Sequence, residues 1–308
     1  MRNSVRSSRL LAAVALAAAG GSALIGPAPA AAQQPGWAPF VAVTPAYEGD
    51  SDLEGGGEFG LSAVQLRLGT AGPVGTGFHA GVTLNYDYYD SSFSNPTVFG
   101  ATAPWGNVYR YGVSVPLAWP LNNEWSIALA PSVDWFRESG ASSSDSLIWG
   151  AALSAVRRSG DGNLIGIGIA AYDAIEETKV FPVVVVDWRL GDRWRLINPL
   201  PAGPTGPAGL ELDYQFDGGW SLGVGAAYRS LRFRLSDSGP VPRGVGEING
   251  VPIFARATYD LAKQWTLHIY AGAITGGELR VEDRNGNLLR KDDFDTGPFV
   301  ALTVTARF

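Results

Sequence analysis

The segment VDWRLGDRWRL (residues 186–196) places two tryptophans six positions apart around a short Gly-Asp turn. The same spacing recurs in WPLNNEWSI (119–127), YQFDGGWSL (214–222) and YDLAKQWTL (259–267). In every copy an apolar residue follows the first aromatic residue by two positions, and another follows the tryptophan by two. Each copy therefore predicts the end of one β-strand, a tight turn and the start of the next strand.

The chain around these turns alternates bulky apolar residues with small or polar ones. Between Trp125 and Trp135 every second residue is apolar and large, and residues 78–88 and 109–119 follow the same rule. A period of two predicts β-strands, and no segment has a convincing helical period. Fourteen strands are expected, with twelve as the fallback because 193–198 is short: 37–47, 58–69, 77–88, 107–119, 124–136, 145–157, 163–172, 180–190, 193–198, 209–217, 219–234, 250–261, 264–276 and 297–308.

The connections between these strands alternate in length. Short turns are expected near 120–124, 158–162, 190–193, 217–219 and 262–264. The longer, mostly polar connections are 48–57, 89–106, 137–144, 173–179, 199–208, 237–249 and 277–296. Short turns at one end and long loops at the other are typical of a closed antiparallel transmembrane β-barrel with periplasmic turns and extracellular loops. An even number of strands places both termini in the periplasm.

Aromatic residues at the turns fit the membrane boundary. Phe78 and Tyr88, Tyr109 and Trp119, and Trp125 and Trp135 are each ten residues apart. Ten residues of tilted strand span ~25 Å, the height of the apolar band of such barrels. Aromatic rings favour the interface between lipid and water. The periplasmic girdle is therefore predicted to comprise Trp119, Trp125, Trp188, Trp194, Tyr214, Trp220, Tyr259 and Trp265.

Both ends of the chain carry export signals. Residues 1–32 combine three arginines, an apolar run and a small-residue stretch ending Ala30-Ala31-Ala32, which predicts a cleaved signal peptide. Residues 33–308 then form one barrel domain in the cell outer membrane. The last strand ends at Phe308 with apolar residues on one face, and it resembles the signal read by the barrel-assembly machinery. That machinery, outer-membrane lipid and lipopolysaccharide are the expected partners.

Composition excludes several classes of protein. The formal charge of the chain is −6, and it becomes more negative when the leader with its three arginines is removed. No nucleic-acid partner is therefore expected. The chain has no cysteine, which rules out disulfides and thiolate chemistry. Neither a cofactor nor a metal is expected, because Asp283-Arg-Asn-Gly-Asn287 matches a calcium loop only in part and 166–171 lacks the context of a dinucleotide fingerprint.

The turns RLGDRWRLINP, LDYQFDGGWSLGVGAAYRS and TYDLAKQWTLHIYAG, together with the terminal Phe, resemble a family of Gram-negative outer-membrane β-barrels of unknown function. The resemblance covers roughly residues 105–308. It implies location and fold, and it carries over no catalytic residue.

The polar faces of the predicted strands point into the lumen. Both signs of charge are present there, and they gather between residues 187 and 256: Asp187, Arg189, Arg193, Arg195, Glu211, Asp213, Arg229 and Arg256. One hypothesis is a water-filled passage for small hydrophilic solutes, selected by the field of these charges. The alternative is a set of structural ion pairs in a non-conducting barrel that acts through its loops.

Three further hypotheses remain at this stage. His79 and His268 face inward, but neither has a serine beside it in the manner of acyl hydrolases, so an outer-membrane lipid hydrolase is the least favoured alternative and no enzyme is predicted. The acidic loop Glu48–Glu54 could bind lipopolysaccharide through divalent cations. Loops 89–106 and 277–296 are long enough to fold inward and plug the lumen.

Overall fold

The computed structural model describes residues 36–75, 77–160 and 162–308, so the predicted signal peptide lies outside the described residues. One sheet contains all the strands. In chain order they are β1 (Ala38–Asp52), β2 (Glu58–Val74), β3 (Phe78–Ser94), β4 (Val108–Ser114), β5 (Leu117–Pro120), β6 (Trp125–Glu138), β7 (Leu147–Arg158), β8 (Leu164–Ala174), β9 (Thr178–Arg189), β10 (Trp194–Ile197), β11 (Gly209–Gln215), β12 (Trp220–Ala227), β13 (Arg229–Arg234), β14 (Val245–Ala262), β15 (Trp265–Glu282), β16 (Leu288–Phe294) and β17 (Gly297–Arg307).

These segments form fourteen wall strands, which confirms the predicted number. Three wall strands are interrupted: β4 and β5 both pair with β3 and β6, β12 and β13 with β14, and β16 and β17 with β15. Short β10 holds its own place between β9 and β11. Antiparallel pairing of β1 with β17 closes the barrel.

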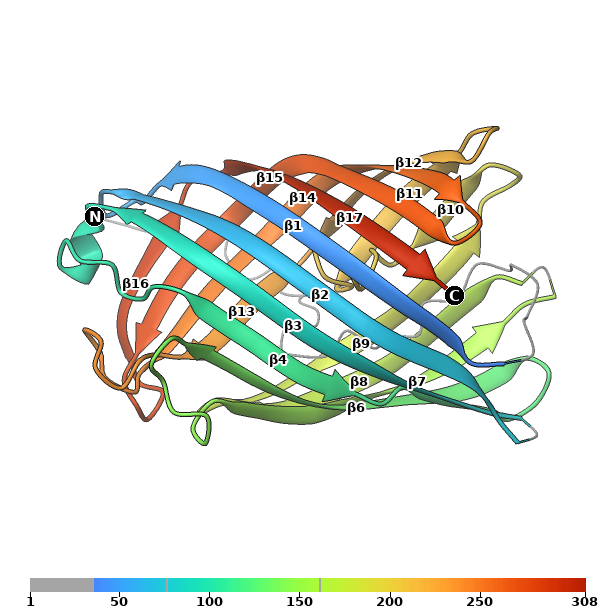
Figure 1. Cartoon of the computed structure of the whole chain (residues 1–308), viewed down its shortest axis with the longest axis horizontal. Helices are drawn as coiled ribbons and strands as arrows, with labels where there is room; N and C mark the ends of the chain where they lie inside the picture. Colours follow the sequence, from blue (N-terminus) through green and yellow to red (C-terminus); the bar gives the residue numbers. More distant parts are fainter. Residues whose placement is uncertain (1–35, 76, 161) are drawn as a thin grey trace, which may run out of the picture.

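The start of β1 and the end of β17 lie together at one end of the barrel (Figure 1). There the Phe308 N–H donates to the Pro39 carbonyl at 2.9 Å. The short turns, such as those before β6, β10 and β15, lie at this same end. It is called the periplasmic end below, and the opposite end the extracellular end.

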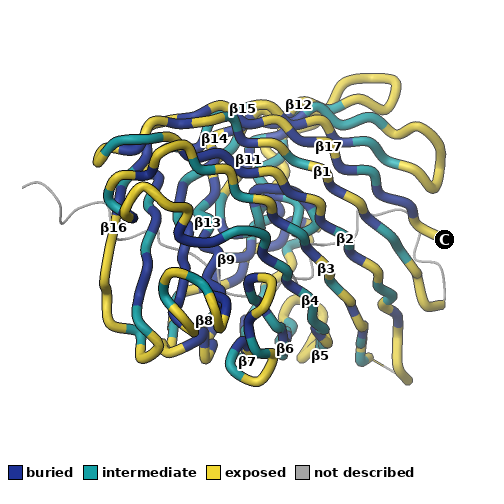
Figure 2. The backbone as a smooth tube through the Cα atoms, turned by 60° about the vertical axis from the view of Figure 1, so that its left-hand side comes forward, coloured by how far each residue is buried: buried dark blue, intermediate teal, exposed yellow. Residues whose placement is uncertain are grey.

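The outer wall is apolar, as a lipid-facing surface requires. In β8, Ile165, Ile167 and Ile169 are 47%, 73% and 53% exposed, whereas Ala170 and Tyr172 of the same strand are buried inside. The alternation of buried and exposed residues continues along β1, β2 and β3 (Figure 2). No helix among the described residues is long and apolar enough to cross a membrane.

The expected extracellular loop 277–296 is mostly strand and continues the wall, so it does not fold inward as its length would have allowed. The strands β15 and β16 extend the wall beyond the membrane as a hairpin, whose tip contains Asn285 and Gly286 as expected. Gly286 has φ +81°, and the Asp283 N–H donates to Asn287 O at 2.8 Å. Outside the membrane both faces of a strand carry polar residues, so the hydrophobic alternation that marks strands is lost there.

Candidate functional site in the barrel lumen

Buried ion pairs line one side of the lumen. Arg67 of β2 makes a bidentate ion pair with Asp87 of β3. Arg110 Nε of β4 lies 3.1 Å from Asp134 Oδ1 of β6, which also accepts a 2.7 Å hydrogen bond from Asn85. Both aspartates are at most 1% exposed. Carboxylates buried this deeply require such partners, and both of them have one.

The predicted charge cluster divides into separate groups on the other side of the lumen. Arg256 Nε lies 2.7 Å from Glu211 Oε1, and its Nη2 lies 3.7 Å from Asp213 Oδ1. Arg195 of β10 pairs with Asp187 of β9. Five of the eight predicted cluster residues thus make two ion-paired groups on β9, β10, β11 and β14.

The remaining cluster residues lie elsewhere. Arg229 pairs with Glu48 of β1, which is not a neighbouring strand, so this ion pair crosses the lumen. Arg189 and Arg193 are exposed at the periplasmic rim, where Arg193 Nη2 lies 3.1 Å from Asp217 Oδ2. Alternation along a strand continues past the membrane edge, so it does not show where the lumen ends.

Residues 198–208, called the inner loop below, fold into the lumen. The Ala202 carbonyl accepts a 2.8 Å hydrogen bond from Thr44 Oγ1 on β1, far across the barrel from β10. Thr205 is 1% exposed, and a Cβ on Gly203 would stand 2.6 Å from the Tyr270 hydroxyl on β15. The chain therefore leaves the wall after four residues of β10 and contacts the opposite side.

From its position between two strands, segment 199–208 was expected to be an extracellular loop, and that prediction was wrong. Its composition could have indicated the inward fold. The sequence NPLPAGPTGPA is rich in Pro and Gly and has no charged residue, unlike the other long connections. Proline stiffens a segment and lowers the entropy lost when it is held in one conformation. That composition fits a segment packed inside protein better than one exposed to water.

Aromatic side chains fill the extracellular half of the lumen. Trp105, from the loop after β3, is 1% exposed, and its ring lies 5.3 Å from those of Phe93 and Phe233 in edge-on contacts. Its indole N–H donates to Ser91 Oγ at 3.1 Å. Loop 89–106 therefore reaches inward, as the sequence allowed. The same cluster includes Phe136.

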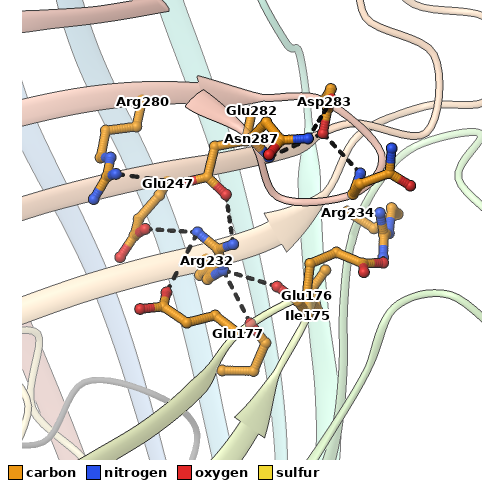
Figure 3. A network of polar contacts seen from close by, with 12 residues as sticks. Ile175, Glu176, Glu177, Arg232, Arg234, Glu247, Arg280, Glu282, Asp283 and Asn287 are labelled. Atoms are coloured by element: carbon orange, nitrogen blue, oxygen red, sulfur yellow. Dashed lines mark hydrogen bonds and ion pairs between the residues drawn. The ribbon is translucent and has the colours of Figure 1, made fainter. Parts of the chain in front are cut away.

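An arginine network closes the extracellular end (Figure 3). Arg232 of β13 lies 2.9 Å from Glu247 Oε2 and 2.6 Å from Glu282 Oε2, and its Nε donates to the Ala174 and Ile175 carbonyls at 2.9 and 3.0 Å. At its end, β13 forms a parallel bridge with β6 between Arg234 and Arg137. Because β6 is not a neighbouring wall strand, the wall bends inward at β13. This network was not predicted, because Glu247 and Glu282 lie in segments that were expected to be loops.

A second ion pair lies in the extracellular loops, outside the membrane band. The Arg243 guanidinium bonds to Asp145 and holds the pKa of that carboxyl below its ordinary value. A lowered carboxyl pKa means that the pair is intact at neutral pH and is lost only as the pH falls through that pKa.

The predicted interface residues occupy the periplasmic end of the outer wall. Trp194 and Tyr214 have ring centroids 4.8 Å apart, and Trp220 stacks on Tyr259 at 4.2 Å. Phe308 is 58% exposed. The other four members of the girdle are also exposed: Trp119, Trp125, Trp188 and Trp265.

The two histidines lie on different strands, His79 on β3 and His268 on β15. His268 Nδ1 contacts the hydroxyl of Thr258 at 3.0 Å, and His79 is exposed near the periplasmic rim. Within residues 36–308, apart from positions 76 and 161, no three histidine or acidic side chains are arranged to hold a metal ion.

Fold and lumen together define a transmembrane β-barrel with an occupied interior. The chain belongs to the family described as "Domain of unknown function (DUF6268)", whose pattern matches residues 79–287. This confirms the resemblance drawn from the turns and the terminal strand.

Several solved barrels are similar to the chain. The COG4313 outer membrane channel from Pseudomonas putida F1 is 11% identical, with 88% of this chain and 95% of that chain covered and a TM-score of 0.46. The P. putida toluene transporter TodX is 10% identical, with 89% and 90% covered and a TM-score of 0.39. The KdgM porin, in complex with disordered oligogalacturonate, is 12% identical, with 87% and 99% covered and a TM-score of 0.35. No curated protein sequence matches.

Proposed function

We propose that this protein is an outer-membrane channel for small hydrophilic solutes in which the inner loop restricts passage. The observation that carries the proposal is the hydrogen bond from Thr44 to Ala202, which joins the inner loop to the far wall. Continuing β10 to the membrane surface would add backbone hydrogen bonds to the wall. The chain instead places eleven residues in the lumen, an arrangement suited to controlling passage.

The polar lining supports hydrophilic solutes. Gln65 Oε1, Arg67 Nε, Glu211 Oε2 and Arg229 Nε are buried and have no hydrogen-bond partner among the described residues. A buried polar atom without a partner costs roughly 1–3 kcal/mol. Contact with water or a polar solute would remove that cost, so these atoms favour a hydrated passage. Charges of opposite sign on its walls would select among solutes.

A second candidate is a non-conducting barrel that acts at the cell surface. It is favoured by the Trp105 cluster and the Arg232 network, which close the extracellular half. In this proposal lipopolysaccharide contacts the loops, including the acidic segment 48–54, and lipid surrounds the aromatic girdle. Insertion through the barrel-assembly machinery, with Phe308 as its signal, is common to both proposals.

Replacing residues 200–206 by two glycines is expected to raise single-channel conductance severalfold, because the segment that crosses the lumen would no longer reach Thr44. The measurement is made on mature protein refolded in detergent and inserted into planar bilayers. The substitution Thr44→Val keeps the whole inner loop and removes its hydrogen bond to the wall, together with the Thr44–Thr303 contact, so it should increase opening frequency more than open-state conductance.

Folding of each variant is checked by its heat-modifiable mobility on gels. Folded loop-deleted protein without conductance steps would contradict the channel and favour the surface barrel.

A further inference from the structure

The wall of the barrel has a break beside β9. Pairing of β10 with β9 extends only from Arg195↔Arg189 to Ile197↔Asp187, after which the chain enters the inner loop. The strand β11 begins at Gly209 and pairs with β12. On the extracellular side of these residues β9 faces β13, and no strand pairing joins the two. This break, between residues 178–184 of β9 and 229–232 of β13, is called the lateral seam.

The backbone along the seam lacks a partner strand. Odd-numbered residues of β9 direct their peptide groups to β8, as the bond between Ala174 N and Glu177 O sets the register. Even-numbered residues therefore direct theirs into the seam, and the described residues place no strand opposite Val180. Pro182, also on this edge, has no N–H to leave unpaired.

One side chain closes the periplasmic corner of the seam. Asn198 Oδ1 accepts the Val186 N–H at 2.8 Å, and Asn198 Nδ2 donates to the carbonyls of Val184 and Gly209 at 3.1 and 3.0 Å. A single amide thus replaces strand pairing between β9 and β11. At the extracellular corner Lys179 Nζ lies 2.6 Å from Glu247 Oε1.

The seam lies at the depth of the outer leaflet. Thr178 pairs with Asp173, which pairs with Trp149, an aromatic residue 56% exposed on the outer wall. Trp188, at the periplasmic girdle, is ten residues further along β9, or ~25 Å of tilted strand. An unpaired strand edge within the hydrocarbon region is tolerated only where it lines a cavity or is buried in protein.

On the β9 side, the lumen face of the seam is apolar. Val183 is 2% exposed, and Phe181 stacks on Tyr172 with ring centroids 5.8 Å apart and planes at 14°. On the β13 side Leu231 is buried, whereas Arg229 is held by Glu48 and Arg232 by Glu247 and Glu282. A solute that entered the lumen here would meet hydrocarbon side chains on one side and lipid on the other.

We propose that the lateral seam is a portal through which small apolar molecules pass between the lumen and the outer leaflet. This goes beyond axial passage of hydrophilic solutes. An apolar molecule is stabilised in hydrocarbon and would have to pass the buried ion pairs to continue along the barrel axis. At the seam it would meet the apolar face of β9, while the charges of β13 are neutralised in ion pairs.

The first test measures contact between lipid and the lumen face of the seam. Single variants Phe181→Cys, Ala170→Cys and Val180→Cys are labelled with bimane in a chain that has no native cysteine. Vesicles then carry nitroxide-labelled acyl chains that quench the fluorophore on contact. Ala170 pairs directly with Phe181 and is 1% exposed, so it reports a lumen position at the same depth behind continuous wall. Val180 is 59% exposed on the outside.

The portal predicts strong quenching at positions 181 and 180 and weak quenching at 170. Quenching at 181 as weak as at 170 would overturn it. Should a label at 170 disturb folding, Val183→Cys provides a second seam position, and its quenching is compared with that of 180 alone.

The second test locks the seam. Lys179→Cys with Glu247→Cys is joined by a short bismaleimide, and uptake of N-phenylnaphthylamine by cells is compared before and after cross-linking. Uptake should fall to that of cells without the protein, whereas undiminished uptake refutes the portal. Salt conductance of the same cross-linked protein is recorded separately, so failure of the axial channel and failure of the portal give different results.

Discussion

Replacing Arg232 with alanine is expected to lower the free energy of unfolding by about 3–5 kcal/mol, the range for removing one partner of a buried ion pair. Arg232 is 3% exposed and contacts two carboxylates, of which Glu247 is 2% and Glu282 4% exposed. Its loss removes the shortest ion-pair contact of Glu282, leaves Glu247 with Lys179, and frees the buried carbonyls of Ala174 and Ile175. The measurement is urea unfolding in lipid vesicles, followed by tryptophan fluorescence.

The matched control is Arg157→Ala, at the periplasmic end of β7. Arg157 also pairs with a glutamate, Glu124, but both side chains are more than half exposed. Exposed ion pairs contribute less than about 1 kcal/mol, so this variant should unfold almost like the native protein. If both arginine variants lost the same small amount, the Arg232 network would not stabilise the barrel. Arg232→Met combined with Glu247→Gln and Glu282→Gln should recover most of the loss.

Replacing Asn198 with alanine is expected to cost about 3 kcal/mol, because three backbone groups at membrane depth lose their partner and each buried loss costs roughly 1–3 kcal/mol. Asn198→Asp keeps an acceptor for the Val186 N–H but turns a carboxylate oxygen toward the Val184 and Gly209 carbonyls, so it should cost at least as much as alanine. The same unfolding measurement applies.

Asn122 offers a matched control for Asn198. Its Oδ1 accepts two backbone N–H groups, those of Glu124 and Trp125, in an exposed turn. Water replaces these bonds on mutation, so Asn122→Ala should cost under about 1 kcal/mol. Equal effects of the two substitutions would mean that the β9–β11 corner is already hydrated. The portal predicts that Asn198→Ala also increases lipid quenching of a label at Phe181.

Much of the candidate site was predictable only as a list of inward-facing residues. Alternation assigned Glu211, Asp213 and Arg256 to the lumen, and neighbouring strands brought them together. The pairing of Arg229 with Glu48 was not predictable, because it depends on which walls face each other across the lumen. Alternation also assigned Arg189 and Arg193 to the lumen, but both are exposed at the periplasmic rim, outside it.

The sequence by itself determined the closed antiparallel barrel and its fourteen strands, because each membrane-spanning strand needs an apolar face of fixed height toward lipid. Those constraints act residue by residue and remain visible in a pattern of period two. Only the tertiary structure decided what occupies the lumen and where the wall is broken. The inner loop, the Arg232 network and the lateral seam depend on contacts between strands that are far apart in the chain. The local sequence pattern does not show which distant strands come into contact.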